Sequence, residues 1–157
     1  MPQNKYLLRF KKLKYIYART EIFFCNVEEA EKILEKENTD KNILELAKGI
    51  QVLGPKMVVL SDGPNGAYLY MDETLYHNPI YPDIAPPLDR TGAGDAFSST
   101  FVAALALGKT PLEAFTWGPI NSMSVVQEVG AQKGLLSKEK IEEYLKNAPE
   151  EYKAKKI

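Results

Sequence analysis

Apolar side chains recur along this chain at two spacings. Where they return every three or four residues they predict helices, and short continuous or alternating runs predict strands. The predicted helices cover residues 6–17, 26–36, 41–53, 97–107 and 137–147, with a further helix opening at 110. The predicted strands cover residues 21–25, 57–60, 67–70 and 74–77, the last two forming a hairpin around Met71-Asp72-Glu73.

Local signals mark the ends of several helices. Asn26, followed three residues later by Glu29, is typical of an N-cap with a capping box. Thr110-Pro111-Leu112-Glu113 is a second capping box, with proline at the first helical position. Ser137 caps the last helix, and residues 150–157 are charged and expected to be frayed.

The order of these elements predicts the fold class. Because strands alternate with helices, the chain is expected to be an α/β protein with a mainly parallel sheet. Only two strong core strands precede the hairpin. That is a thin sheet for such a fold, and it suggests that strands are missing upstream.

The most informative stretch is Gly92-Ala93-Gly94-Asp95, between a proline-rich loop and the apolar run 97–107. A glycine turn that opens a helix leaves backbone N–H groups free, and with the helix dipole they attract anionic oxygens. Asp95 then stands where a base could remove a proton from a phosphate-accepting hydroxyl. The alternative is a plain tight turn with an acid in the first helical turn. A dinucleotide fingerprint fits poorly, because its third glycine would fall at Phe97.

Three other segments invite a functional reading. Residues 61–66, Ser-Asp-Gly-Pro-Asn-Gly, follow a buried strand, where α/β proteins hold ligands, although the sequence alone favours a plain turn. Asn26 and Glu29 could also organise hydrated Mg²⁺ if they faced Asp95, but the capping box alone explains them. Residues 108–110 mimic the end of a Walker A loop, and a helix stop followed by a cap explains them better.

Composition narrows the function classes. The chain has 157 residues, 45% of them hydrophobic and 26% charged, with a net charge of −1. This balance argues against a broad nucleic-acid or membrane surface. The single cysteine, Cys25, is expected to be a buried thiol, and His77, the single histidine, a loop residue. No leader or membrane-spanning stretch is recognisable, so the cytoplasm is the expected location.

Together these segments resemble the ribokinase-like (PfkB) family of carbohydrate and nucleoside kinases. Four features carry the resemblance in the family's order: Asn26 to Glu29, Ser61 to Gly66, Asp89 to Asp95, and Val129-Gly130-Ala131. The resemblance implies a ribokinase-like, Rossmann-like three-layer α/β/α fold. It also implies ATP-dependent phosphorylation of a hydroxyl on a sugar or related small molecule, with ATP and Mg²⁺ as cofactors.

The same resemblance implies roles for individual residues. Asp95 would be the base, and the N–H groups around Gly92, Ala93 and Gly94 would hold the transferring phosphoryl group. Glu29 would organise Mg²⁺ through water, and Asp89 and Thr91 occupy positions that bind a monovalent cation such as K⁺ in some members. The ATP site would be formed by Asn26, Ser61, Gly63, Gly66, Gly94, Asn121 and Gly130.

The chain also departs from the family pattern. Arg90 and Thr100 replace small residues, and Arg90 could reach a phosphate or be solvated. The family's polar nucleotide-contacting position aligns with Pro119, two residues from Asn121.

Family members are about twice as long as this chain. Residues 1–157 are therefore expected to be one domain, the carboxyl-terminal nucleotide-binding half, without the amino-terminal half and lid. Two alternatives to a kinase stay open. One is a non-catalytic nucleotide-binding fragment. The other is an interaction half that self-associates through an open sheet edge or pairs with a separate chain.

Overall fold

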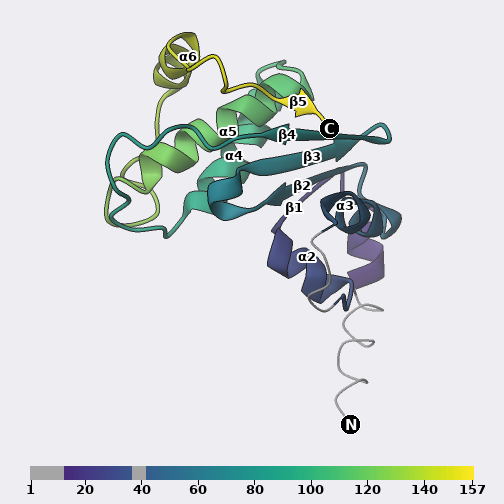
Figure 1. The fold of residues 1–157 in the computed structure, drawn as a ribbon. Coiled ribbons are helices and arrows are strands. Elements are labelled where there is room, and N and C mark those ends of the chain that lie inside the picture. The colour runs from purple at the N-terminus through teal and green to yellow at the C-terminus, as the bar shows by residue number, and fades with distance from the viewer. Residues whose placement is uncertain (1–12, 37–41) are drawn as a thin grey trace. The chain divides into compact units, whose positions relative to one another are not determined.

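A computed structural model describes residues 13–36 and 42–157, and the chain divides into two compact units (Figure 1). The first unit runs to Leu60 and includes Tyr68–Leu75, and the second comprises Ser61–Ala67 and Tyr76–Ile157. Among the described residues, five strands form one sheet in the order β1-β2-β3-β4-β5, and β3 and β4 each contribute residues to both units. No helix in this part of the chain is long and apolar enough to cross a membrane.

The first unit is built mainly from two strands, two helices and most of a hairpin. Its elements are β1 (Ile22–Asn26), α2 (Val27–Ile33), α3 (Ile43–Val52), β2 (Met57–Ser61), most of β3 (Ala67–Met71) and the start of β4 (Thr74–Asn78). Each begins within two residues of its predicted start. The predicted first helix is present over 13–17, and the rest of it lies outside the described residues.

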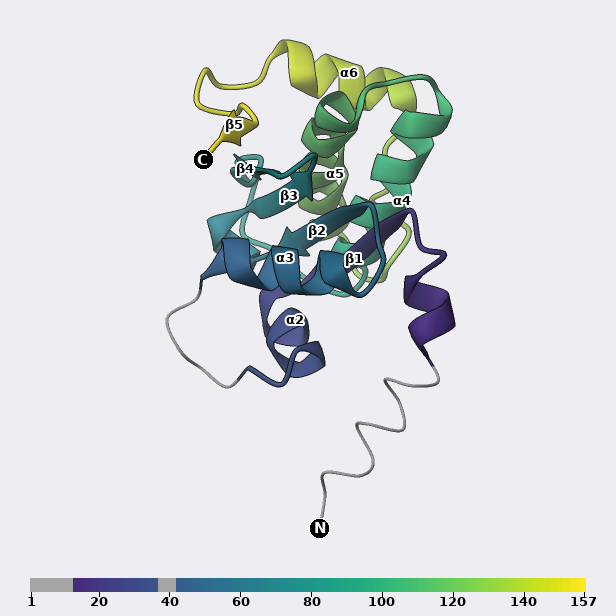
Figure 2. The same cartoon turned by 90° about the vertical axis from the view of Figure 1, so that its right-hand side faces the viewer.

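Apolar faces of these elements form the core of the first unit. Figure 2 shows α2 and α3 next to each other, and they are in contact. Val27 and Ala30 of α2, Ile50 of α3 and Val58 of β2 are almost completely buried. Cys25 packs against this cluster, and burial, followed by the negative charge of Glu29, raises the pKa of its thiol to about 12. A thiol with so high a pKa is a poor nucleophile, which fits the predicted structural cysteine.

The β3–β4 hairpin closes through a two-residue turn. Asp72 and Glu73 both have positive φ, 47° and 58°, as a type I′ turn requires. A turn this short can only join antiparallel strands. The sheet therefore contains two antiparallel pairs in succession, since β4 also pairs antiparallel with β5 (Lys155–Lys156).

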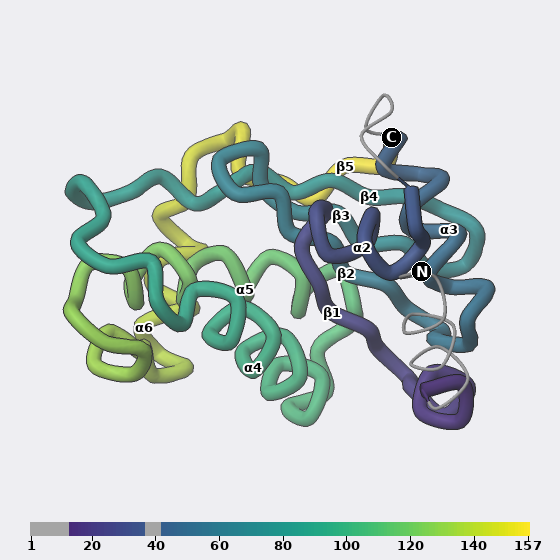
Figure 3. The backbone as a smooth tube through the Cα atoms, turned by 90° about the horizontal axis from the view of Figure 1, so that it is seen from below, coloured from purple at the N-terminus to yellow at the C-terminus, as the bar shows by residue number. Residues whose placement is uncertain are grey.

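Helix packing dominates the second unit. It contains the 3₁₀ turn Gly63–Asn65 and the helices α4 (Ala93–Ala106), α5 (Pro111–Val125) and α6 (Lys138–Lys146). Helices α4 and α5 lie side by side in Figure 3 and are in extensive contact. The rings of Phe97 and Phe115 meet edge to face across this interface, with centroids 6.2 Å apart. A Cβ on Gly118 would lie only 3.0 Å from the Phe97 ring, so glycine allows this close approach.

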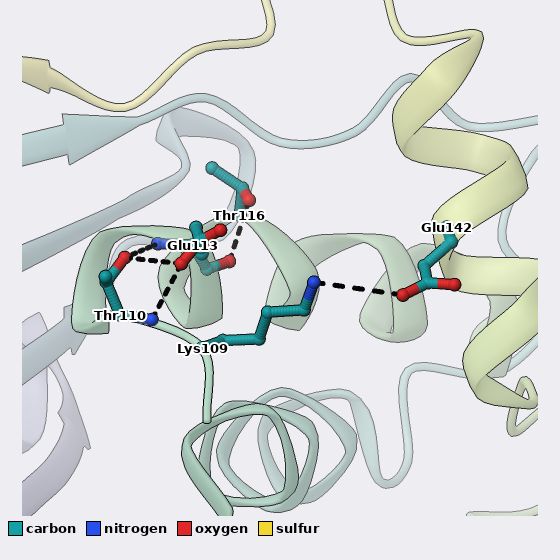
Figure 4. A network of polar contacts seen from close by, with 5 residues as sticks. All are labelled: Lys109, Thr110, Glu113, Thr116 and Glu142. Carbon is teal, nitrogen blue, oxygen red and sulfur yellow. Dashed lines mark hydrogen bonds and ion pairs between the residues drawn. The ribbon is translucent and has the colours of Figure 1, made fainter. Parts of the chain in front are cut away.

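The capping box predicted for α5 is present (Figure 4). The Glu113 carboxylate accepts the backbone N–H of Thr110 at 2.7 Å and its hydroxyl at 2.8 Å. Just before the cap, Lys109 reaches Glu142 of α6 at 3.9 Å and lies 5.5 Å from the centre of the Trp117 ring. This connection therefore joins the start of α5 to α6.

The carboxyl-terminal tail is ordered, contrary to the predicted frayed end. Tyr152 is 5% exposed, and its hydroxyl donates to the backbone oxygen of Thr116 at 2.5 Å. Its ring meets that of Tyr81 edge to face, with centroids 4.9 Å apart. Beyond it, Lys156 of β5 pairs with Tyr76 of β4. The tail is mostly charged, but the buried side chain of Tyr152 anchors it to the rest of the unit.

A buried polar bridge joins α4, α5 and the segment after α5. The side-chain amide of Asn121 donates to the Thr100 hydroxyl at 2.7 Å, and its oxygen accepts the backbone N–H of Leu136 at 2.9 Å. Both side chains are 5% exposed. Thr100, which departs from the family pattern, supplies the acceptor that buried Asn121 needs.

Thr100→Val keeps the shape of the side chain and removes that acceptor. We expect its free energy of unfolding to fall by about 1–3 kcal/mol, because a buried amide N–H loses its partner. Urea unfolding followed by circular dichroism measures this. The control is Ser99→Ala on the exposed side of α4, which we expect to stay within about 0.5 kcal/mol. Equal stability of Thr100→Val and the wild type would show that the hydrogen bond from Asn121 to Thr100 does not stabilise the fold.

Candidate functional site

A pocket of about 220 Å³ lies wholly within the second unit. Its walls come from the turn after β2, the loop after β4, the first turn of α4 and one face of α5. Most of the lining is apolar, including Phe97, Pro119 and Met123. Among the residues that the structure describes, the only charged side chains that line it are Asp83 and Arg90. A pocket of this kind suits a flat apolar group attached to a charged one.

The predicted glycine turn forms one side of this pocket. Gly92 has φ 85° and is the N-cap of α4, with no side chain capping the helix. A Cβ there would come within 2.7 Å of Ala131, so both its backbone and its packing require glycine. At Gly94 a Cβ would meet no atom within 4 Å, and Gly94 lines the pocket. The first glycine therefore shapes the turn, while the second leaves space beside it.

The first turn of α4 offers backbone donors to a ligand. The N–H of Ala96 is satisfied by Gly92, and that of Ala93 makes a long contact of 3.4 Å with Arg90. Within the described chain, no residue accepts the N–H of Gly94 or Asp95. These two donors lie at a helix N-terminus, an arrangement that suits an anionic ligand, and the predicted anion site stays a prediction.

Asp89 holds this turn in place. Its Oδ1 accepts the backbone N–H of Thr91 at 2.9 Å, and its Oδ2 accepts that of Gly130 at 3.1 Å. These hydrogen bonds, those from Thr91 first and that from Gly130 after them, lower the pKa of the carboxyl group below its usual value. The structure therefore brings together two segments, at Asp89 and Gly130, that the sequence analysis assigned to one site.

The turn after β2 is fixed by backbone contacts. The N–H of Asp62 donates to Gly66 at 2.9 Å, and the imidazole Nε2 of His77 lies 2.8 Å from the Asn65 oxygen. Gly66 has φ 91°, and a Cβ there would come within 2.9 Å of Pro79. His77 lies in β4 and supports this turn, so the prediction of a loop residue was wrong. Ser61, Gly63 and Gly66 all line the pocket.

Asp95 lies beside the pocket without lining it. It is exposed in the first turn of α4, and its backbone oxygen accepts the hydroxyl of Ser99 at 2.7 Å. Gly94, its neighbour, does line the pocket. Asp95 thus follows the pocket-lining Gly94 directly in the first turn of α4, and it is not part of the apolar walls.

Two residues predicted to bind the nucleotide form hydrogen bonds to other residues of the chain. Asn121 is buried and lies outside the pocket lining. Its side-chain amide is hydrogen-bonded to the Thr100 hydroxyl and to the backbone N–H of Leu136. Gly130 has φ 97° and donates its N–H to Asp89. We therefore assign both a structural role around the pocket.

Sequence reasoning missed one face of α5. Pro119, Ser122, Met123 and Val126 all line the pocket, and the hydroxyl of Ser122 donates to the backbone oxygen of Ala93 at 2.7 Å. Their spacing of three, four and seven residues is the signal that they share a helix face. The segment is largely apolar, so the sequence analysis assigned it to the core.

Asn26 and Glu29 belong to the first unit. Asn26 Oδ1 accepts the Glu29 N–H at 2.7 Å, and Glu29 Oε2 accepts the Asn26 N–H at 2.9 Å, which confirms the predicted capping box. Both side chains are exposed. In the described part of the chain, no three His, Cys, Asp or Glu residues are grouped as a metal site would need.

The two glycines of the turn should respond differently to alanine. Gly92→Ala should lower the free energy of unfolding by roughly 1–3 kcal/mol or more, because its φ is positive and Ala131 blocks the methyl group. Gly94→Ala, in ordinary helical backbone, should leave it unchanged or raise it by up to about 1 kcal/mol. Urea unfolding of both variants measures the contrast. Equal effects would contradict this division of roles.

Asp89 should make the free energy of unfolding depend on pH in the acid range. Its pKa is lowered in the folded chain, so its contribution is present above the pKa of the unfolded state and is lost as pH falls through the folded pKa. We expect stability to fall below about pH 4, and the fall to be shallower in Asp89→Asn, whose amide does not titrate in this range. Urea midpoints measured from pH 6 to pH 2.5 test this. Parallel curves for the variant and the wild type would refute it.

Known proteins resemble this chain over most of its length. The ATP-dependent 6-phosphofructokinase of Thermoanaerobacterium thermosaccharolyticum is 31% identical over 76% of this chain and 35% of its own length. The cytidine kinase of Thermococcus kodakarensis is 34% identical over 71% of this chain and 38% of its own. This chain thus spans less than half the length of these relatives.

Structural similarity agrees. The crystal structure of a ribokinase from Thermotoga maritima matches with a TM-score of 0.74 and 28% identity, covering 85% of this chain and 45% of that one. This confirms the predicted ribokinase-like α/β fold, present here as a partial domain. Residues 4–138 match the family described as pfkB family carbohydrate kinase, and the chain belongs to that family.

Proposed function

We propose that this chain carries the nucleotide-binding and phosphoryl-transferring part of a kinase that uses ATP to phosphorylate a hydroxyl on a sugar or related small molecule. The observation that carries the proposal is the turn at Gly92. It presents the N–H groups of Gly94 and Asp95 beside a pocket of about 220 Å³. Family membership supplies the reaction class.

The nucleotide occupies the pocket in this proposal. Its base and ribose lie against the apolar wall formed by Phe97 and Met123, and its phosphates point toward Gly94. Ser61, Gly63 and Gly66 line the same pocket from the turn after β2. The name of the relative from Thermoanaerobacterium, an ATP-dependent kinase, supports ATP as the donor.

The turn stabilises the phosphoryl group during transfer. Phosphoryl transfer spreads negative charge over the equatorial oxygens, and catalysis consists mostly of positioning and charge stabilisation. The N–H groups of Gly94 and Asp95 are fixed by the helix before any ligand binds, so they need no reorganisation as charge develops. In this proposal the turn formed by Gly92, Ala93 and Gly94 is the anion hole, and its free donors are the N–H groups of Gly94 and Asp95.

Asp95 is the general base. Asp95 lies in the first turn of α4, directly after Gly94, and outside the lining of the proposed nucleotide pocket. A base for an acceptor hydroxyl has to face the acceptor and not the donor, and this placement supports that role. The carboxylate takes the proton as the hydroxyl oxygen attacks the terminal phosphorus.

The proposed reaction also uses metal ions. Asn26 and Glu29 are candidates to hold hydrated Mg²⁺, because Glu29 uses only Oε2 in the capping box and Mg²⁺ usually keeps several waters. When bound, Mg²⁺ neutralises the phosphate charge. A K⁺ ion beside Asp89 and Thr91 would bind the remaining lone pairs of the Asp89 carboxylate, both oxygens of which already accept an N–H.

We further propose that the matched segment corresponds to the carboxyl-terminal half of the family fold. The motifs of the nucleotide side lie in this chain, and its matched share of the relatives is 35% and 38% of their length. The side chains that would select the acceptor are not among the motifs recognised.

Asp95→Asn separates binding from chemistry. We expect turnover to fall roughly 10²–10⁴-fold, because the amide cannot accept the hydroxyl proton, while the Kd for Mg-ATP stays unchanged. Titration calorimetry with Mg-ATP measures binding, and an assay of ADP release with a panel of sugars and nucleosides measures turnover. The matched control is Asp72→Asn, an exposed acid in the β3–β4 turn.

Two results would overturn the proposal. If the folded chain binds no Mg-ATP at millimolar concentration, the pocket is not a nucleotide site. If Asp95→Asn turns over like the wild type, Asp95 is not the base. Gly94→Ala adds an independent check, since its methyl group enters the space beside the free N–H groups and should weaken Mg-ATP binding in a stable protein.

A further inference from the structure

Arg90 is the only cation among the described residues that line the pocket. The other charged lining residue is Asp83, and the remaining walls are mainly apolar. A ligand with several negative charges would therefore meet one guanidinium group in this pocket. The sequence left open whether Arg90 contacts a phosphate or is simply solvated.

The backbone of Arg90 is held on both sides. Asp89 binds the N–H groups of Thr91 and Gly130, and the Arg90 oxygen lies 3.4 Å from the N–H of Ala93. Arg90 is thus fixed at the start of the turn that presents Gly94. Its side chain begins from a defined point at the edge of the pocket.

The guanidinium group itself has no partner in the described chain. No hydrogen bond, ion pair or ring contact is made to it, and the residue is exposed. Asp83 lines the same pocket and does not pair with it. Several exposed lysines do form ion pairs, such as Lys133 with Glu128 at 2.7 Å. Arg90 is therefore available to a ligand.

Phosphate is the chemistry that this arrangement fits. A guanidinium group is planar and can donate two parallel hydrogen bonds to phosphate oxygens. The free N–H groups at the start of α4 favour negative charge in the same region. A neutral sugar hydroxyl would gain little from either group.

We infer that Arg90 binds the polyphosphate chain of the nucleotide donor and sets the preference of the site for triphosphate over less phosphorylated ligands. This inference rests on the proposed function and adds a residue to it. Arg90 pairs with phosphate oxygens at the pocket edge, while Gly94 donates its N–H from the turn. The base and ribose then contribute separately through the apolar wall.

The test compares Arg90→Ala, Arg90→Lys and the wild type in the full 157-residue chain. Titration calorimetry with ATP, ADP, AMP and adenosine, at constant Mg²⁺, measures each Kd. We expect Arg90→Ala to weaken ATP binding roughly 10–100-fold, ADP less, and adenosine not at all, because the lost charge-assisted hydrogen bonds go to phosphate. Arg90→Lys should lie between them, since lysine keeps the charge and loses the planar fork.

The matched control is Lys153→Ala, which removes an exposed positive charge of the same unit outside the pocket lining. It should bind ATP as the wild type does. Raising the salt concentration should weaken ATP binding to the wild type more than to Arg90→Ala. Competition by inorganic phosphate against ATP should likewise be weaker in Arg90→Ala.

The outcomes separate this inference from the proposed function. If Gly94→Ala weakens ATP binding and Arg90→Ala does not, the pocket binds nucleotide but Arg90 has no part in it. If Arg90→Ala weakens the binding of adenosine as much as the binding of ATP, the residue supports the pocket structurally and the inference fails. If the folded wild type binds no ATP, both statements fall together.

Discussion

The candidate site depends on one carboxylate. Asp89 accepts an N–H from Thr91 and another from Gly130, residues that are 39 apart in the sequence. The glycine turn and the segment after α5 are thus held against each other by charge-assisted hydrogen bonds. The same contact brings Ala131 so close to Gly92 that only glycine fits. The direction in which the first turn of α4 points follows from this contact.

Once that turn is fixed, the rest of the site needs few polar side chains. The anion donors are backbone N–H groups, and the walls are apolar residues of α4 and α5. Backbone donors cannot change rotamer, so they keep their positions between ligands. Among the described lining residues, Arg90 is the long flexible group that carries a positive charge, which suits a ligand whose negative charge is concentrated at one end.

Local sequence predicted what local interactions determine. The caps at Asn26, Thr110 and Ser137 were predicted correctly because each is a contact within three residues. Contacts between distant residues were missed. Tyr152 anchors the tail on Thr116 and Tyr81, and His77 supports the Asn65 turn.

The α5 wall was hidden for a different reason, since apolar residues that line a pocket and apolar residues that fill a core have the same composition. Family resemblance identified the Asp89 and Gly130 segments together but gave Asp89 only a cation-binding role. The hydrogen bonds that join these segments depend on tertiary structure.

The aromatic anchor of the tail has a consequence for the pocket. Tyr81 lines the pocket, donates its hydroxyl to the Tyr144 oxygen at 3.0 Å, and packs its ring against Tyr152. One ring is therefore shared by the pocket wall and the docked tail. A ligand that contacts Tyr81 would therefore also hold the ring against which the tail packs, and it would favour the docked tail.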